Sequence, residues 1–390
     1  MKNKRIIWML TVGLTFGMLT GCGGEEKKTY DQACADLAQG SYDYALQGYQ
    51  SSITAGYKTA EAYRGAGIAN IHLGNYQDAI DSLTNGLNDE KAGKALKKDV
   101  LAYRATAELK SGLNDAAMAD CQTLAESYSM DAETYYLTGC VALAMDSYDE
   151  ASSNFTEAYG EDATYDRAIQ IYEAYLEKDM EADGTRYLEA ALKTEAKNAE
   201  DYCNRGKVYY YMEDYSNAQK ELTEAVNQKS TEGMLLLGMV YRAQGDTSNA
   251  RSMYQQYVSA DDSDPAKGYN GLALCDMDDG SYDSALENIS KGLEDASTEE
   301  MQDLLFNEIV VYEKKLDFAT ALSKIQEYIK MFPDDENAAK ELTFLQSRNG
   351  ELSNDTASDT TENTDAEAAS DAEDTADTSD GSDESGEEEY

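Results

Sequence analysis

A short sequence pattern that returns about every 34 residues restricts the fold of this chain more than any other feature. The segment GSYDYAL at 40–46 recurs as GSYDSAL at 280–286 and as GNYQDAI at 74–80. Looser copies fill the intervals, and a degraded fifth copy has glycine where the others have alanine. The nine equivalent positions, which we call anchors, are Ala45, Ala79, Ala117, Ala151, Gly184, Ala218, Ala250, Ala285 and Ala321. Their spacing of 32 to 38 residues predicts repeated units that stack on one another.

Two further positions keep their character from copy to copy. The residue twelve before the anchor is small in seven of the nine copies, and the residue four after it is always apolar or aromatic. These spacings predict two short amphipathic helices joined by a tight turn. The small residues would lie where the paired helices cross, and the large residue would fill the space between units. The chain has only two prolines, which agrees with an all-α fold.

This pattern resembles the tetratricopeptide repeat (TPR) family, whose 34-residue unit has a small–aromatic–alanine signature. The resemblance covers roughly Lys27 to Pro333 and implies a right-handed helix-turn-helix solenoid of about nine repeats, assigned to residues 29–333. The fifth repeat departs from the signature through Tyr172 and Gly184, and the third step is lengthened by a Lys-rich stretch at 91–98.

The C-terminal part is expected to contain a capping helix followed by a tail. At 334–350, Asp334 or Asp335 can cap a helix that stops at Asn349-Gly350, and its apolar residues can cover the last repeat. Residues 351–390 contain 16 acidic residues and no lysine or arginine. Such a segment cannot bury enough apolar surface to fold, so the sequence predicts a disordered acidic tail.

The N-terminus has the features of a secretory signal at residues 1–21. Basic residues precede a 14-residue, largely apolar run at 6–19, which is shorter than the about 20 residues needed to span a bilayer. The run ends in Leu19-Thr20-Gly21-Cys22, which resembles the lipobox of bacterial lipoproteins. The resemblance implies a diacylglyceryl group on Cys22, a short tether over 22–28, and a lipid-anchored protein on the extracytoplasmic face of the cell membrane.

The charge and residue content narrow the function. With 76 acidic and 32 basic residues, the net charge is −44, which disfavours nucleic acid as a partner. The single histidine, His72, and the absence of CxxC spacing point away from metal, cofactor and enzyme chemistry. The acidic run 276–279 before Gly280 lacks the glycine position of an EF-hand loop. Free buried thiols are favoured for the remaining cysteines, with a Cys121–Cys140 bridge left open.

The TPR resemblance also implies a binding groove on the concave face, lined by the first helix of each repeat. The positions carried over are Tyr30, Arg64, Ile68, Tyr136, Cys140, Lys207, Tyr210, Leu235, Met239, Arg242, Asn270, Leu274, Phe306 and Val310. They lack the Lys/Asn clamp with which some TPR proteins hold a terminal carboxylate. They favour an extended or helical protein segment held by aromatic anchors and some charge selection, although some of the aromatics can instead pack between repeats.

Two functions follow as hypotheses. The first is a non-enzymatic, membrane-anchored scaffold that binds a protein or peptide partner in the groove and assists an envelope complex. The alternative is an envelope lipoprotein that binds a glycan or solute on some of its 30 tyrosines.

Overall fold

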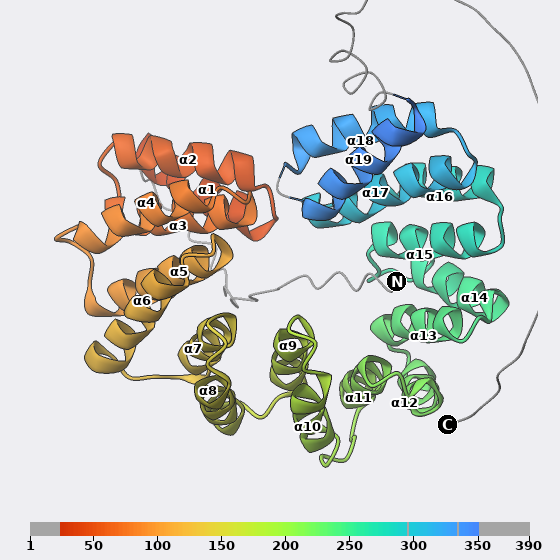
Figure 1. Ribbon diagram of the computed structural model, residues 1–390, viewed down its shortest axis with the longest axis horizontal. Coiled ribbons are helices and arrows are strands. Elements are labelled where there is room, and N and C mark those ends of the chain that lie inside the picture. The colour runs from red at the N-terminus through yellow and green to blue at the C-terminus, as the bar shows by residue number, and fades with distance from the viewer. Residues whose placement is uncertain (1–23, 295, 334, 351–390) are drawn as a thin grey trace, which may run out of the picture.

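The computed structural model describes residues 24–294, 296–333 and 335–350 (Figure 1). The signal segment with Cys22 and the acidic tail lie outside these residues. The described part contains nineteen α-helices and no strand. They are α1 Glu25–Ala38, α2 Tyr42–Thr54, α3 Thr59–His72, α4 Tyr76–Asn88, α5 Lys94–Lys110, α6 Asn114–Ser127, α7 Ala132–Ala144, α8 Tyr148–Glu161, α9 Tyr165–Leu176, α10 Glu181–Ala191, α11 Ala199–Tyr211, α12 Tyr215–Asn227, α13 Thr231–Ala243, α14 Thr247–Val258, α15 Pro265–Asp278, α16 Tyr282–Gly292, α17 Thr298–Lys314, α18 Phe318–Met331 and α19 Glu336–Arg348.

Each odd-numbered helix up to α17 packs against the even-numbered helix that follows it, which confirms the all-α solenoid of paired helices. Figure 1 shows the pairs arranged in a ring, with the first helix of each pair on the inside and the second on the outside. Among the described helices, none combines the length and the apolar character that crossing a membrane requires.

The turn inside each pair has one backbone conformation in all nine repeats. The residue five before each anchor has a positive φ, between 56° and 79°. The amide of the next residue donates a hydrogen bond back across the turn, as from Ser41 N to Asp36 O at 2.8 Å and from Ser281 N to Asp276 O at 2.7 Å. This is the Schellman ending of a helix, and it fixes where the second helix departs. The nine residues are Gly40, Gly74, Gly112, Asp146, Asp179, Glu213, Gly245, Gly280 and Leu316.

The contact between paired helices follows the predicted exchange of small and large residues. A Cβ added to Gly139 of α7 would lie 2.6 Å from the ring of Phe155 in α8, and one added to Gly206 of α11 would lie 2.4 Å from Leu222 in α12. Phe155 and Leu222 are fully buried. The absence of a side chain on the first helix therefore lets the large side chain of the second helix fill the crossing point.

The fifth repeat makes the same contact with the two sizes exchanged. Here Tyr172 occupies the small position of α9, and Gly184 of α10 replaces the anchor alanine. A Cβ on Gly184 would lie 2.9 Å from Tyr172 Cα, so the backbones meet where other repeats place a methyl group. The large side chain of Tyr172 on α9 is thus balanced by the missing side chain of Gly184 on α10, so the total volume of the contact is kept.

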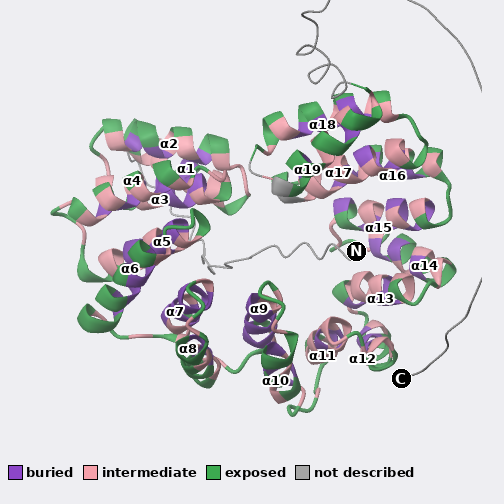
Figure 2. Cartoon of the chain, in the orientation of Figure 1, coloured by how far each residue is buried: buried purple, intermediate pink, exposed green. Residues whose placement is uncertain are grey.

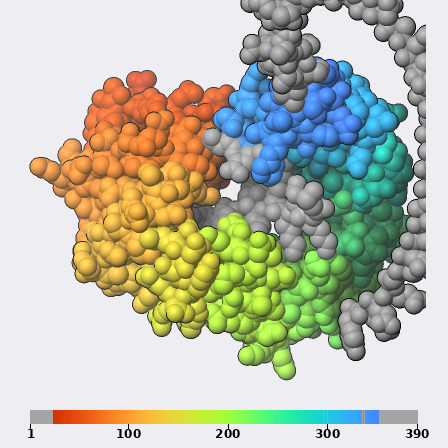
Figure 3. All heavy atoms as spheres, viewed as in Figure 1, coloured from red at the N-terminus to blue at the C-terminus, as the bar shows by residue number. Residues whose placement is uncertain are grey.

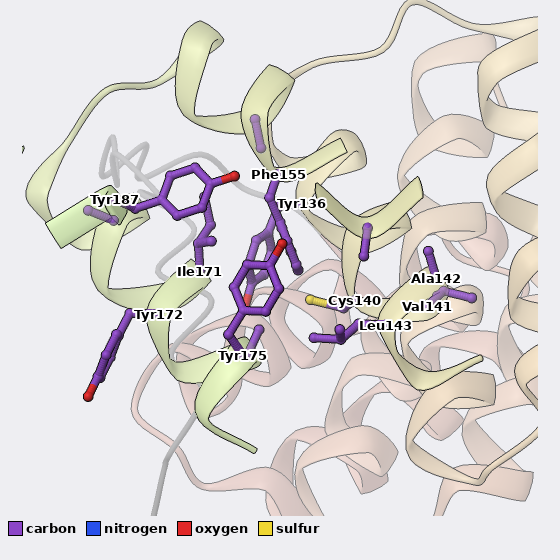
Figure 4. Packing of buried hydrophobic residues seen from close by; sticks show 14 of the residues in the cluster. Tyr136, Cys140, Val141, Ala142, Leu143, Phe155, Ile171, Tyr172, Tyr175 and Tyr187 are labelled. Carbon is purple, nitrogen blue, oxygen red and sulfur yellow. The ribbon is translucent and has the colours of Figure 1, made fainter. Parts of the chain in front are cut away.

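The largest hydrophobic cluster joins the third to the sixth repeat and contains many rings (Figure 4). The ring of Phe155 lies 5.8 Å from that of Tyr136 and 5.2 Å from that of Tyr175. Because these rings come from three successive helices, they join neighbouring repeats as well as paired helices. Figure 2 shows the buried residues on the faces where helices meet.

Both ends of the solenoid are helical. Helix α1 starts at Glu25, so residues 25–28 of the expected tether are helical, and two first-turn acids lie at the positive end of the helix. Helix α19 starts after Asp335, whose carboxylate accepts hydrogen bonds from the backbone of the first turn. Leu345 of α19 is fully buried against the last repeat, while Phe344 stays 40% exposed.

The exchanged contact in the fifth repeat generates a stability prediction. Replacing Gly184 with alanine restores the residue that the other repeats carry, yet the structure predicts a loss of about 1–3 kcal/mol, because the new methyl group meets backbone. The matched control is Gly160→Ala in α8, where a Cβ meets nothing within 4 Å and the gain is up to about 1 kcal/mol. Urea midpoints followed by helical circular dichroism measure both. A Gly184→Ala protein as stable as Gly160→Ala would contradict this account of the repeat.

Candidate functional site

The first helices of the pairs form the inner wall of the ring, and this wall is the candidate site. Figure 3 shows the atoms of successive repeats surrounding a central opening. The groove residues predicted from the sequence lie on these inner helices, namely α1, α3, α7, α11, α13, α15 and α17. Their surroundings differ sharply from one position to the next.

The three cations predicted for the groove are held by acids of neighbouring repeats. Arg64 of α3 pairs with Asp99 of α5. Lys207 of α11 reaches Asp166 of α9 at 3.5 Å. The Nε of Arg242 in α13 lies 2.6 Å from an oxygen of Asp278 in α15.

These side chains join repeats to one another, because each long basic side chain reaches an acid on an adjacent inner helix. These three cations are therefore already paired with acids of this chain, and they are not available as free charges for a partner.

The predicted aromatic anchors are packed into the wall to different degrees. Tyr136 is only 5% exposed, and burial raises its pKa well above the ordinary value. Tyr30 is half-buried, with its ring 5.9 Å from that of Tyr49 and 6.0 Å from that of Tyr57. Tyr136 thus offers a partner almost no surface, and Tyr30 offers part of its surface.

Further along the wall, Tyr210 and Phe306 are also half-buried. The ring of Tyr210 lies 5.7 Å from that of Tyr215, and the ring of Phe306 lies 5.7 Å from that of Tyr328. These rings, like that of Tyr30, pack between helices and keep part of their surface exposed, so their role as anchors for a partner stays a prediction.

The other residues predicted for the groove also differ in how far they are buried. Ile68 is 7% exposed and Cys140 is 8% exposed, so both belong to the core. Asn270 accepts a hydrogen bond at 2.7 Å from Asn307 of the next inner helix. The remaining residues are half-buried, and these are Leu235, Met239, Leu274 and Val310.

A set of acidic residues on the same wall was missed in the sequence analysis. In the second to the seventh repeat, the residue six before the small position is always acidic. Six residues of an α-helix place it about 120° around from the face that meets the second helix. We call this set the acidic ladder, and it consists of Glu61, Asp99, Glu133, Asp166, Glu200 and Glu232.

The ladder has paired and unpaired members. Asp99 and Asp166 hold the cations described above, and Glu133 pairs with the buried Arg167 of α9. Glu61, Glu200 and Glu232 are exposed and have no ion pair with any basic residue in the described ranges. Five of the six lie in the first turns of their helices, where they also complement the helix dipole. The sequence itself contains this pattern, because all six acids of the ladder stand at the same position when the repeats are aligned on their anchors.

The other residues considered for chemistry are occupied structurally. All five cysteines in the described ranges are free thiols, so Cys121 and Cys140 are not bridged. Burial raises the pKa of the Cys121 thiol to about 11. The imidazole of His72 stacks on Tyr42 with a centroid distance of 4.2 Å, and burial lowers its pKa.

The acidic run that was weighed as a calcium loop is likewise engaged. Asp276 accepts hydrogen bonds from Arg251 at 2.6 Å and from Asn288 at 2.7 Å. Among the described residues, no cluster of three or more histidine, cysteine or acidic side chains has the geometry to hold a metal ion.

Comparisons with known proteins support the type of repeat that the sequence predicts. Residues 30–89 and 203–265 match the family model of the tetratricopeptide repeat. The BBSome complex member BBS4 homolog of Drosophila melanogaster is 23% identical over 309 residues, which make up 75% of this chain and 57% of that protein. This chain therefore spans little more than half the length of that relative. The matched segments identify tetratricopeptide repeats in this chain, a type of repeat that typically acts as a protein-interaction scaffold.

Two solved structures also match this chain, with TM-scores below 0.5. Yeast Tom70 is 14% identical with a TM-score of 0.38, covering 84% of this chain and 89% of that one. A tetratricopeptide repeat protein from Parabacteroides merdae is 14% identical with a TM-score of 0.39, covering 64% of this chain and 98% of that one.

One buried carboxyl group on an inner helix, that of Glu108, is only partly satisfied by its neighbours. Glu108 of α5 is 7% exposed, and its Oε2 has no hydrogen-bond partner. Arg104 bonds Asp120 at 2.7 Å and stays 3.7 Å from Glu108. Burial, with a further contribution from the Asp120 charge, raises the pKa of Glu108 to about 7.

This raised pKa predicts a pH-dependent stability. Folded Glu108 keeps its proton up to about pH 7, whereas an unfolded glutamate loses it near pH 4.3, so its contribution to stability falls as the pH rises through that window. Glu108→Gln should therefore stabilise the protein by about 1–2 kcal/mol at pH 8 and by much less at pH 5. The exposed Glu126→Gln of α6 is the control, with urea midpoints at both pH values as the readout. Equal effects of Glu108→Gln at the two pH values would rule out this assignment.

Proposed function

We propose that this chain is a lipid-anchored scaffold on the extracytoplasmic face of the cell membrane, which holds a basic segment of a partner protein against its inner wall and so assists an envelope complex. The observation that carries the proposal is the acidic ladder, half of which has no basic partner within the described part of the chain. Lysine or arginine side chains of a partner would complete these pairs, and like charge would exclude acidic segments.

The inner wall supports this choice of partner chemistry. The three cations predicted for the groove are held by neighbouring acids, as Lys207 is by Asp166, whereas three acids of the ladder are exposed and have no basic partner among the described residues. Half-buried apolar side chains such as Leu235 and Met239 lie on the same helices and can contact the stems of long basic residues. The relative from Drosophila is named as a member of a multiprotein complex, and this supports a role in assembly.

The alternative of a glycan or solute ligand receives less support. Stacking needs exposed ring faces, and the predicted groove rings are packed against other rings, as Tyr30 is against Tyr49 and Tyr57. The described tyrosines that are most exposed, Tyr44 and Tyr148, lie on outer helices.

Membrane attachment rests on the sequence Leu19-Thr20-Gly21-Cys22. Incorporation of labelled palmitate in the producing bacterium tests it. Cys22→Ser is expected to abolish the label, because the sulfur that would carry the diacylglyceryl group is gone, whereas Cys34→Ser in α1 keeps it. Label retained by the Cys22→Ser protein would refute the anchor and leave the binding proposal standing.

Neutralising the unpaired ladder tests the basic partner. The triple variant Glu61→Gln, Glu200→Gln, Glu232→Gln should bind a fluorescent 20-residue lysine-rich peptide about 3- to 150-fold more weakly at low salt, because each of the three exposed pairs contributes about 0.2–1 kcal/mol. Fluorescence anisotropy measures the affinity.

The control removes the same charge from outer helices, through Asp43→Asn, Asp115→Asn and Asp149→Asn. These three acids are exposed and lie in the first turns of α2, α6 and α8. The acidic tail is present in every variant, so only the difference between the two triples reports on the inner wall. Equal losses from both would show that the peptide follows net charge and not the ladder.

A further inference from the structure

The two ends of the solenoid touch and close the ring. The hydroxyl of Thr298, at the start of α17, donates a hydrogen bond of 3.1 Å to the carbonyl of Gly40, in the turn between α1 and α2. These residues are 258 positions apart, which is between seven and eight periods of about 34 residues. One superhelical turn therefore brings the ninth repeat against the first, as Figure 1 shows at the gap between α1–α2 and α17.

The closing contact is small and polar. A cavity of about 730 Å³ lies between the two ends, and its lining is mainly polar. Thr298 itself is exposed. The lining residues are Gln39, Ser41, Ser263, Asp264, Pro265, Ala296, Ser297, Thr298, Glu300 and Met301.

The polar groups on the α17 side are engaged within the eighth and ninth repeats. Ser297 and Glu300 form a capping box, in which the amide of Ser297 donates to Glu300 at 2.9 Å. Lys267 lies 3.3 Å from Asp264 and 3.4 Å from Glu300. These contacts stabilise the first turns of α15 and α17. The hydroxyl of Thr298 takes no part in them and instead bonds the turn between α1 and α2.

The joint between the ends differs from every joint between sequential repeats. The cluster around Ala33, Ala45 and Tyr49 stays within the first repeats, and the cluster around Ala273, Ile289 and Leu304 stays within the eighth and ninth. No buried apolar cluster in the described ranges combines the two ends. An exposed hydrogen bond exchanges readily with water, so this joint is the weakest in the ring.

We propose that the Gly40–Thr298 contact is a gate, through which the ring opens to admit an internal segment of a partner chain from the side and then closes around it. This inference rests on the proposed function and narrows its partner. A partner with folded parts on both sides of the basic segment cannot thread through a closed ring, and it can pass through an opened joint.

The free protein tests the gate without any ligand. Spin labels at Gln39→Cys and Met301→Cys, in a Cys34→Ser background of the full chain, report the distance across the joint. We expect two populations, of which the longer grows roughly two- to tenfold in the Thr298→Val variant that lacks the hydroxyl donor. A single narrow distance that Thr298→Val leaves unchanged would overturn the gate whatever the protein binds.

A covalent lock tests what the gate admits. The same two cysteines are joined by a short flexible bismaleimide, and each single-cysteine variant treated alike is the control. The probes are the 20-residue lysine-rich peptide with free ends, and the same peptide placed between two folded domains.

The lock should reduce capture of the flanked probe at least tenfold and leave the affinity for the free-ended peptide within about twofold. Equal capture of the flanked probe with and without the lock would overturn the gate. If the unlocked protein binds neither probe, the basic-segment function fails, and the distance measurement still decides the gate.

Discussion

The close crossing of a small residue and a large side chain within each helix pair is the contact on which the rest of this structure depends. It sets the distance between paired helices, as Gly139 and Phe155 show. The large ring then reaches the next repeat, as Phe155 reaches Tyr175. Repetition of this geometry curves the chain until α17 returns to the turn after α1. The ring, its inner wall and its weak joint are all consequences of that one contact.

Much of the fold could be predicted because its rules are local. The period, the turn and the small–large exchange recur within a few residues of each anchor, so the nine helix pairs were visible in the sequence. The fifth repeat was visible only as a departure, because the match between Tyr172 and Gly184 requires knowing which backbones meet. The turns at Asp146, Glu213 and Leu316 lack the glycine that such a φ favours, and the fixed position in the repeat imposes the conformation.

The candidate site was less accessible to sequence reasoning because it depends on contacts between repeats. Position alone selected Tyr136 and Arg64, whereas burial against Phe155 and pairing with Asp99 follow from the stacking of neighbouring helices. The offset that defines the acidic ladder is present in the alignment of the repeats, but only the contacts between repeats show which of its acids are paired and which are exposed. Ring closure could not be predicted, since it sums small rotations over 258 residues that no single motif records.

The central claim is that the partner binds the inner wall, and photo-crosslinking in living cells that produce the protein tests it most directly. A photoreactive amino acid replaces Glu200 or Glu232 on inner helices, and Glu224 or Gln256 at exposed positions of outer helices serves as the matched set. The account predicts discrete protein adducts from the inner positions and none from the outer ones. Adducts from the outer positions alone, or the same adducts from both sets, would contradict it.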